Sequence, residues 1–150
     1  MLAKASPMTT MSDIDLRDPR AFEHWARDTV RFSDTDMVGH VNNVAIAAFA
    51  ETGRLAFDRD VILPLLGGAS TILARLEIDY LRETHWPGDV EIGSRVIHVG
   101  NSSLRIGQGL FRDGTCFATS IAVMVNLRDG VSHPFGADAR ERLLLLLASR

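Results

Sequence analysis

Hydrophobic and polar positions follow two different periods along this chain. Residues 44–50 are apolar on every helical face, and the segment continues to residue 62 with charged residues interspersed. A surface helix keeps one polar face, so this pattern predicts a fully buried helix over residues 44–62. Asn42 and Asn43 precede the helix, and asparagine is favoured at the cap of a helix N-terminus. Small side chains that would let a sheet approach closely are Ala45, Ala47, Ala48 and Ala50.

The pattern changes to that of strands after Pro64 and the Gly67-Gly68 pair. A β-rich segment at residues 25–32 precedes the predicted helix, and a short amphipathic helix is predicted over residues 138–149. Strands in series with tight turns form an antiparallel sheet, so the expected class is α+β, with one long helix packed on the sheet. Four long segments separated by turn residues are predicted strands: residues 71–81, 90–99, 103–112 and 116–128.

Length and composition predict a single globular domain. The chain has 150 residues, of which 46% are hydrophobic and 23% charged. We expect a loose polar tail over residues 1–20 and one domain over residues 21–150. The net charge of −3 offers no basic surface to nucleic acid. No apolar run reaches the ~20 residues of a membrane span, and the single cysteine, Cys116, fits a reducing compartment. A cytoplasmic protein without nucleic-acid or membrane partners is therefore expected.

A polar stretch just before the predicted helix carries the candidate chemistry. Residues 34–43 contain two aspartates, a histidine and two asparagines. A capped, solvated loop would explain them. A calcium loop would not, because Val38 and Ala45 stand at ligand positions. Catalysis at the helix start is the third interpretation, since the unpaired N–H groups there can stabilise an oxyanion and a neighbouring carboxylate can act as nucleophile or general base.

No metal or cofactor is expected from the sequence. There is no Walker or Rossmann glycine pattern, and no G-x-S-x-G elbow of a serine hydrolase. Four further histidines share no ligand spacing, which argues against a zinc site: His24, His85, His98 and His133.

The string RFSDTDMVGHVNN, followed by the predicted helix, resembles the 4-hydroxybenzoyl-CoA thioesterase-like branch of the hotdog-fold superfamily. The resemblance covers about residues 24–128, including ARLEIDYLRETHWPGDVEI and RDGTCFATSIAVMVNL. It implies an antiparallel sheet wrapped around one central helix. It also implies a homodimer or homotetramer with the active site at the protomer interface, and hydrolysis of an acyl-CoA to the free acid and CoA.

The resemblance also implies roles for three residues near the helix start. Asp36 matches the loop aspartate that serves as nucleophile or general base. Asn43 falls where a backbone N–H polarises the thioester carbonyl. His40 matches one member of the Asp-x-Asn-x-His arrangement of plant-type acyl-ACP thioesterases, but Val38 replaces the asparagine. His40 is therefore expected to contribute to the site by orienting the loop or lining it.

Glu51, on the predicted helix, is a second candidate carboxylate, because some hotdog enzymes use a helix glutamate. Arg54 lies three residues further along, and side chains at this spacing on a helix can meet. A structural ion pair with Arg54 is therefore the expected role of Glu51.

The expected coenzyme A contact is the turn between the third and fourth strands. In the hydroxybenzoyl enzyme resembled here, basic residues at this turn reach the CoA phosphates, whereas this chain has Gly100-Asn101-Ser102-Ser103. Asn101, Ser102 and Ser103 can donate hydrogen bonds to phosphate, and Arg105 adds a nearby charge. Acyl-CoA is the expected substrate, and an acyl-carrier-protein thioester or acyl binding without turnover are alternatives. Other arginines that could reach the nucleotide are Arg82, Arg95 and Arg112.

Overall fold

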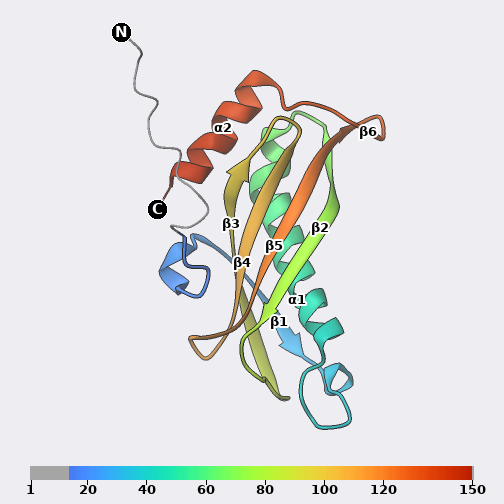
Figure 1. The fold of residues 1–150 in the computed structure, drawn as a ribbon, viewed down its shortest axis with the longest axis vertical. Helices are drawn as coiled ribbons and strands as arrows, with labels where there is room; N and C mark the ends of the chain where they lie inside the picture. The colour runs from blue at the N-terminus through green and yellow to red at the C-terminus, as the bar shows by residue number, and fades with distance from the viewer. Residues whose placement is uncertain (1–13, 150) are drawn as a thin grey trace.

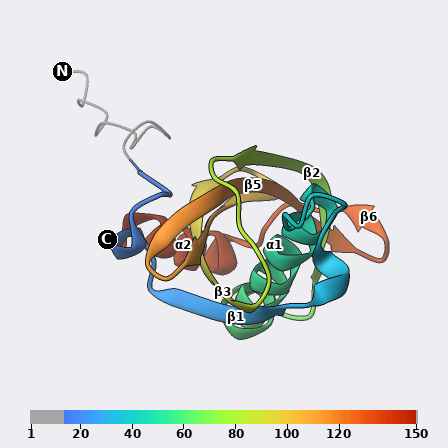
Figure 2. The same ribbon diagram turned by 90° about the horizontal axis from the view of Figure 1, so that it is seen from below.

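A computed structural model describes residues 14–149. Six antiparallel strands form one curled sheet in the order β1-β3-β4-β5-β2, with β6 paired to β5. Helix α1 (Asn43–Phe57) lies in the curve of this sheet, and α2 (Ala137–Ala148) packs near β3 (Figures 1 and 2). The expected α+β class is confirmed. The strands are β1 (His24–Val30), β2 (Ser70–Tyr80), β3 (Gly88–Val99), β4 (Ser103–Arg112), β5 (Thr115–Arg128) and β6 (Val131–Ser132).

Helix α1 is less buried than its sequence predicts, and the last part of the predicted range, Asp58–Ile62, is π-helical. It begins at Asn43, because the Asn42 side chain accepts a hydrogen bond from the Ala45 N–H at 2.8 Å. It ends at Phe57 and continues as a π-helical turn, Asp58–Ile62. Val44 and Leu55 are 71% and 55% exposed in the chain, so the expectation of a fully buried helix is wrong. One sheet covers only one helical face, whose buried residues recur at helical spacing: Ala45, Ile46, Phe49, Ala50, Gly53, Arg54 and Phe57.

A close approach and a polar network fix α1 on the sheet. A Cβ added at Gly53 would lie 2.3 Å from the Ile92 side chain on β3, so only glycine allows this spacing. Fully buried Gln108 donates a hydrogen bond to the Ala50 carbonyl at 3.0 Å. The other contacts of this amide are Ser94 Oγ at 3.0 Å and Ser120 Oγ at 2.8 Å. Because the Gln108 amide is hydrogen-bonded on both its nitrogen and its oxygen, its burial is tolerated.

Two Asp-Gly pairs form tight hairpin turns on the sheet. Asp113 and Gly114 have φ of 50° and 79°, and Asp129 and Gly130 have φ of 52° and 75°. Two consecutive residues with positive φ are typical of the type I′ turn, which matches the twist of the flanking strands. The first turn confirms the predicted hairpin. The second starts the short strand β6, which the sequence analysis did not predict.

Residues 14–20 pack on the domain, although the sequence assigns them to a loose tail. Leu16 contacts a buried cluster formed by Phe22, Phe111 and Cys116. A Cβ on Gly107 would lie 2.8 Å from Leu16, so small residues on β4 make room for this segment. Residues 1–13, the remainder of the expected tail, lie outside the described residues.

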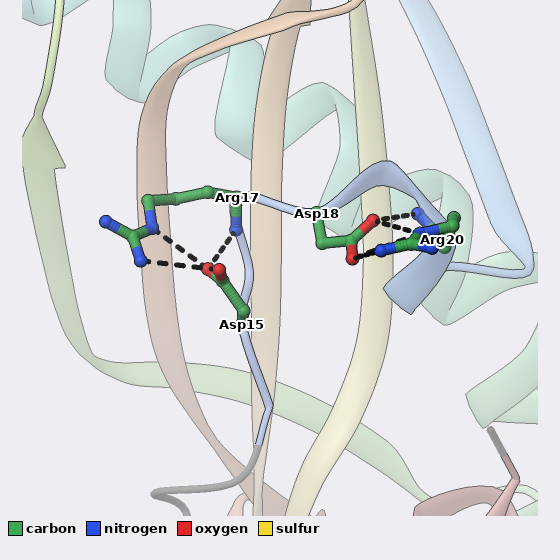
Figure 3. Close-up of polar contacts among 4 residues, drawn as sticks. All are labelled: Asp15, Arg17, Asp18 and Arg20. Carbon is green, nitrogen blue, oxygen red and sulfur yellow. Dashed lines mark hydrogen bonds and ion pairs between the residues drawn. The ribbon is translucent and has the colours of Figure 1, made fainter.

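The same segment also contains two local ion pairs (Figure 3). Arg17 contacts Asp15 at 2.9 Å and Arg20 contacts Asp18 at 2.8 Å, all close in sequence. Such exposed pairs contribute little to stability, so the packing of partly buried Leu16 against the cluster is the contact that favours this position of the segment. Within residues 14–149, no helix combines the length and apolar character required to cross a bilayer.

Candidate functional site

The polar stretch between β1 and α1 folds into a small hairpin. Thr35 pairs with Val41, and inside this pair the Asp36 N–H donates to the His40 carbonyl at 2.8 Å. The Gly39 N–H donates to the Asp36 carbonyl at 3.1 Å, and Gly39 has φ of 85°, which glycine adopts readily. The hairpin therefore holds Asp36 and His40 in a defined geometry.

The two aspartates of this hairpin make different contacts. Asp36 Oδ1 accepts hydrogen bonds from the N–H groups of Val38 at 2.9 Å and His40 at 3.1 Å. Among residues 14–149 no hydrogen bond reaches Asp36 Oδ2, and the residue is exposed. The Asp34 carboxylate instead accepts from the Arg31 N–H at 2.7 Å and stabilises a single helical turn. Each carboxylate keeps one oxygen without a hydrogen bond among residues 14–149, and Asp36 is the more exposed of the two.

The first turn of α1 follows the hairpin directly and offers backbone donors. Asn42 accepts hydrogen bonds from two of these N–H groups. Its side chain accepts from the Ala45 N–H, and its carbonyl accepts from the Ile46 N–H at 3.2 Å. In the part of the chain that the structure describes, the N–H groups of Asn43 and Val44 have no hydrogen-bond partner. A helix N-terminus carries partial positive charge, so these two groups can bind a developing anion.

A distant segment borders the hairpin on its outer side. The Val41 N–H donates to the Thr84 carbonyl at 2.9 Å, and His40 forms an antiparallel bridge with His85. His40 Nε2 lies 3.2 Å from Glu83 Oε2, and the rings of His40 and His85 stand 5.1 Å apart. Sequence reasoning missed Glu83 and His85 as neighbours of His40. Glu83 and His85 lie two residues apart, a spacing that places both side chains on one face of an extended segment. Their contact with His40 joins residues far apart in the chain, so the sequence alone did not indicate it.

Arg112 fixes this outer segment from β4. Its guanidinium donates to Thr84 Oγ1 at 3.1 Å, to the His85 carbonyl at 2.7 Å and to the Pro87 carbonyl. A Cβ on Gly88 would collide with the same guanidinium. Both terminal nitrogens of the Arg112 guanidinium thus donate within the chain, which argues against its use in nucleotide binding.

Arg95 and the Glu51–Arg54 pair also differ from expectation. Arg95 donates to the Ala21 carbonyl at 2.8 Å and to the Ser149 carbonyl at 2.7 Å. Arg54 is buried and Glu51 exposed; no ion pair within 4.0 Å joins them among the described residues. Burial lowers the pKa of the Arg54 guanidinium, while the charges of Glu51 and Asp58 act in the opposite direction.

The two predicted halves of the site lie at opposite ends of the sheet. Val30, just before the hairpin, pairs with Gly88 at the start of β3, whereas the Gly100–Ser103 turn follows the end of β3. A strand of this length spans roughly 36 Å at ~3.3 Å per residue. Figure 1 shows the hairpin at the lower end of the molecule and the β3–β4 turn at the upper end. One chain therefore does not bring Asp36 and the predicted CoA contact together.

The β3–β4 turn itself supports the C-terminal segment. The carbonyls of Asn101 and Ser102 accept hydrogen bonds from the N–H groups of Phe135 at 2.9 Å and Asn126 at 2.8 Å. Their side chains and that of Ser103 stay at or near the surface, and Arg105 is partly buried on β4. Arg140 of α2 donates to the Gly100 carbonyl at 3.3 Å. Helix α2 thus brings a basic side chain to a turn whose sequence has none.

A cavity of about 250 Å³ opens elsewhere, between β1, β3 and the end of α2. It does not include Asp36, His40 or Asn43, so it is separate from the predicted site. Its lining residues are Ala21, Glu23, His24, Phe57, Val61, Ser94, Arg95, Val96, Leu146 and Ser149.

Residues 30–143 match the family model of the thioesterase-like superfamily. The chain belongs to this superfamily. A thioesterase from Thermus thermophilus, described as complexed with coenzyme A and Zn, is 33% identical, with 81% of this chain and 98% of that chain covered and a TM-score of 0.72. A predicted thioesterase from Bacillus stearothermophilus is 28% identical, with 82% and 95% covered and a TM-score of 0.71.

A Bacillus subtilis (strain 168) protein, the uncharacterised YsmA, is 27% identical over 128 residues, or 83% of this chain and 87% of YsmA. Together with the structure, the thioesterase matches confirm the hotdog fold and the family expected from the sequence. They also support hydrolysis of a thioester as the general reaction.

Proposed function

We propose that the protein hydrolyses an acyl-CoA to the free acid and CoA. The observation that carries this proposal is the geometry of Asp36. Two backbone N–H groups hold one carboxylate oxygen, the other oxygen has no hydrogen bond within residues 14–149, and the hairpin leads into the open first turn of α1. The similarity to a thioesterase described as complexed with coenzyme A supports CoA as the carrier.

The reaction uses groups at these two places. Asp36 Oδ2 removes a proton from a water molecule, whose oxygen attacks the thioester carbonyl carbon. The carbonyl oxygen becomes an oxyanion that accepts a hydrogen bond from the Asn43 N–H. The carbon–sulfur bond then breaks, and the CoA thiolate takes the proton from Asp36. In the alternative route, Asp36 attacks the carbonyl carbon itself, and the carbon–sulfur bond breaks to release the CoA thiolate and leave an anhydride. Water then hydrolyses the anhydride to the free acid and the Asp36 carboxylate, and the proton that is released neutralises the thiolate.

His40 contributes to this mechanism as a positioning residue. Its backbone N–H fixes Asp36 Oδ1, and its carbonyl accepts from the Asp36 N–H. Because the His40 backbone makes both bonds, they orient the free carboxylate oxygen of Asp36 without any contact from the imidazole ring.

Substrate binding requires a second copy of the chain in this proposal. The Gly100–Ser103 turn of one copy would hold the CoA nucleotide while Asp36 of another copy acts on the thioester, since one chain holds them at opposite ends of the sheet. Arg140 supplies the positive charge that Asn101, Ser102 and Ser103 lack. Phosphate recognition by arginine gains from charge-assisted hydrogen bonds.

A panel of acyl-CoA thioesters tests the proposal, with release of free thiol as the readout. Hydrolysis of at least one thioester well above the Asp36→Ala background is expected. No hydrolysis across short, long and aromatic acyl groups, with acyl-CoA still bound, would instead identify an acyl-binding protein.

An acyl-carrier-protein thioester is the second candidate substrate, and the uncharged side chains of the turn favour it. Arg140→Gln separates the two carriers. For an acyl-CoA we expect KM to rise several-fold with kcat little changed, whereas Arg142→Gln, which removes a partner of Asp138 on the same helix, leaves KM unchanged. Equal KM values for both variants on acyl-CoA, with faster turnover of the carrier-protein thioester, would reject CoA as the preferred carrier.

A further inference from the structure

Three metal-ligand side chains meet on the outer side of the Asp36 hairpin. His40, Glu83 and His85 each offer one ligand atom, and these atoms all lie within 4.8 Å of one another. The lack of histidine spacing along the chain does not exclude such a site, because residues 40 and 85 meet only through tertiary pairing.

The backbone forces the three side chains onto one face. His40 and His85 are directly opposite in an antiparallel bridge, and paired residues project to the same side. Glu83 precedes His85 by two residues in an extended segment, which places it on that side as well. Thr84, between them, points the other way and is buried, and its hydroxyl accepts a hydrogen bond from Arg112.

The Gly39 carbonyl holds one nitrogen of the His85 ring. Its Nδ1 lies 3.2 Å from the Gly39 carbonyl, and a carbonyl oxygen can only accept a hydrogen bond. Nδ1 therefore donates this hydrogen bond, and in the neutral ring Nε2 is the nitrogen that can bind a metal. A backbone carbonyl that holds the second ring nitrogen is a common outer partner of metal-bound histidine.

The distances suit zinc. Two ligand atoms of a tetrahedral zinc site, each ~2.0–2.1 Å from the metal, lie about 3.3 Å apart. His40 Nε2 and Glu83 Oε2 are 3.2 Å apart. Bringing every pair to that spacing requires shifts on the order of 1 Å. Glu83 and His85 are exposed and free to make such shifts.

Hydrogen bonds hold the backbone on both sides of the cluster. Arg112 holds the backbone at His85 and Pro87, and the Val41 N–H ties the hairpin to Thr84. A simple His40–Glu83 ion pair would explain one contact, but it does not account for a His85 ring nitrogen within 4.8 Å of both groups.

We propose that His40, Glu83 and His85 bind one Zn²⁺ ion, which ties the Asp36 hairpin to the segment of residues 83–85. Imidazole and carboxylate are ordinary zinc ligands, and three protein ligands leave one coordination position open. Binding is measured without turnover, so this proposal can fail while the proposed hydrolysis stands.

Calorimetric titration of the full-length, untagged protein with ZnCl₂ tests the site. About one Zn²⁺ per chain with micromolar or tighter affinity is expected. His85→Gln keeps a donor for the Gly39 carbonyl but removes the ring nitrogen, and should weaken binding at least tenfold. Glu83→Gln, at an exposed position, is the second variant in case His85→Gln does not fold. His133→Gln, at another exposed histidine, is the matched control and should bind as the wild type does.

Thermal unfolding provides a second readout. A ligand that binds only the folded state raises Tm, so Zn²⁺ should raise Tm of the wild type and His133→Gln but not of His85→Gln. Unchanged affinity in both His85→Gln and Glu83→Gln would overturn the proposal. So would loss of binding in His133→Gln, which would indicate adventitious surface coordination.

Discussion

Asp34 and Asp36 lie two residues apart, and their carboxylates make different contacts. Asp34 accepts from the Arg31 N–H in the helical turn before the hairpin, whereas Asp36 accepts from two N–H groups inside the hairpin and is the more exposed of the two. Asp36→Asn preserves an oxygen that can accept from Val38 and His40, so the hairpin should stay folded. We expect kcat to fall by at least ~10²-fold, the size of a general-base effect.

Asp34→Asn is the matched control for this prediction, because it makes the same chemical change in the same hairpin and keeps an acceptor for Arg31. Its kcat should stay near the wild-type value. If Asp36→Asn is fully active on the best thioester, another carboxylate performs the chemistry, and Glu51 becomes the next candidate.

Asn43 is expected to act through its backbone N–H. The structure assigns the cap to Asn42 and makes Asn43 the first helical residue, where proline is tolerated. Asn43→Pro removes the N–H and should lower kcat by roughly 10²–10³-fold, the usual effect of losing one oxyanion donor. Asn43→Ala keeps the donor and should cost little activity.

Steady-state kinetics and melting temperatures of the two Asn43 variants decide between the backbone and the side chain. Equal inactivity of two folded variants would assign the role to the Asn43 side chain. A folded and fully active Asn43→Pro would move the oxyanion contact elsewhere, with the Val44 N–H as the next donor.

At the scale of elements, the contact between α1 and β3 depends on Gly53. At an exposed helix position, replacing glycine with alanine stabilises the folded protein by up to ~1 kcal/mol. At Gly53 the added Cβ would lie 2.3 Å from Ile92, so Gly53→Ala should instead destabilise by about 1–3 kcal/mol. Urea unfolding measures the difference. Ala48→Ser, on the exposed face of α1, should change stability by less than ~0.5 kcal/mol. A more stable Gly53→Ala would show that the helix can move away from the sheet.

An ion-pair cluster joins β1 to the π-helical turn. Asp60 contacts Arg59 at 2.6 Å and His24 at 3.0 Å, and these hydrogen bonds, first that of Arg59, lower the Asp60 pKa to about 2. A lowered carboxyl pKa gives stability that is present above the unfolded pKa and is lost as pH falls through the folded one.

Asp60→Asn should therefore be less stable than the wild type at pH 6, and the difference should shrink as pH falls from about 4 to 2. Unfolding free energies measured across this range provide the test. Asp129→Asn, at an exposed turn residue with positive φ, is the control and should show no such convergence. A pH-independent difference at Asp60 would mean that packing, rather than charge, links β1 to this turn.

At the scale of the whole molecule, β2 is the last strand on one side of the sheet and exposes three large apolar side chains. Ile72, Leu73 and Tyr80, all on β2, are 52%, 39% and 53% exposed, and no strand of residues 14–149 pairs with the outer edge of β2. Such edges and patches associate unless they are covered. We expect sedimentation equilibrium to give at least twice the 16.5 kDa of one chain at micromolar concentration.

Ile72→Lys should shift this equilibrium toward the monomer, because it places a charge on the free edge. Val131→Lys, on exposed β6 away from that edge, should not. A single species of 16.5 kDa for the wild type would contradict the expected assembly and, with it, an active site shared between two copies.

Local signals in the sequence determined most of the elements. The Asp113-Gly114 pair predicts its hairpin because few residue pairs tolerate two positive φ angles. The same reasoning applies to Asp129-Gly130 and would have found β6. Asn42 next to an apolar run marks the start of α1, and RFSDTDMVGHVNN identifies the family together with its candidate aspartate.

Tertiary structure alone decided which distant groups meet. The pairing of His40 with His85, the docking of Arg140 on the Gly100 carbonyl and the exposure of Val44 all depend on contacts between residues far apart in the chain. The period of a segment records its own secondary structure and which face is apolar. It contains no information on which partner covers that face, because packing and hydrogen bonding across the sheet are set by the whole fold.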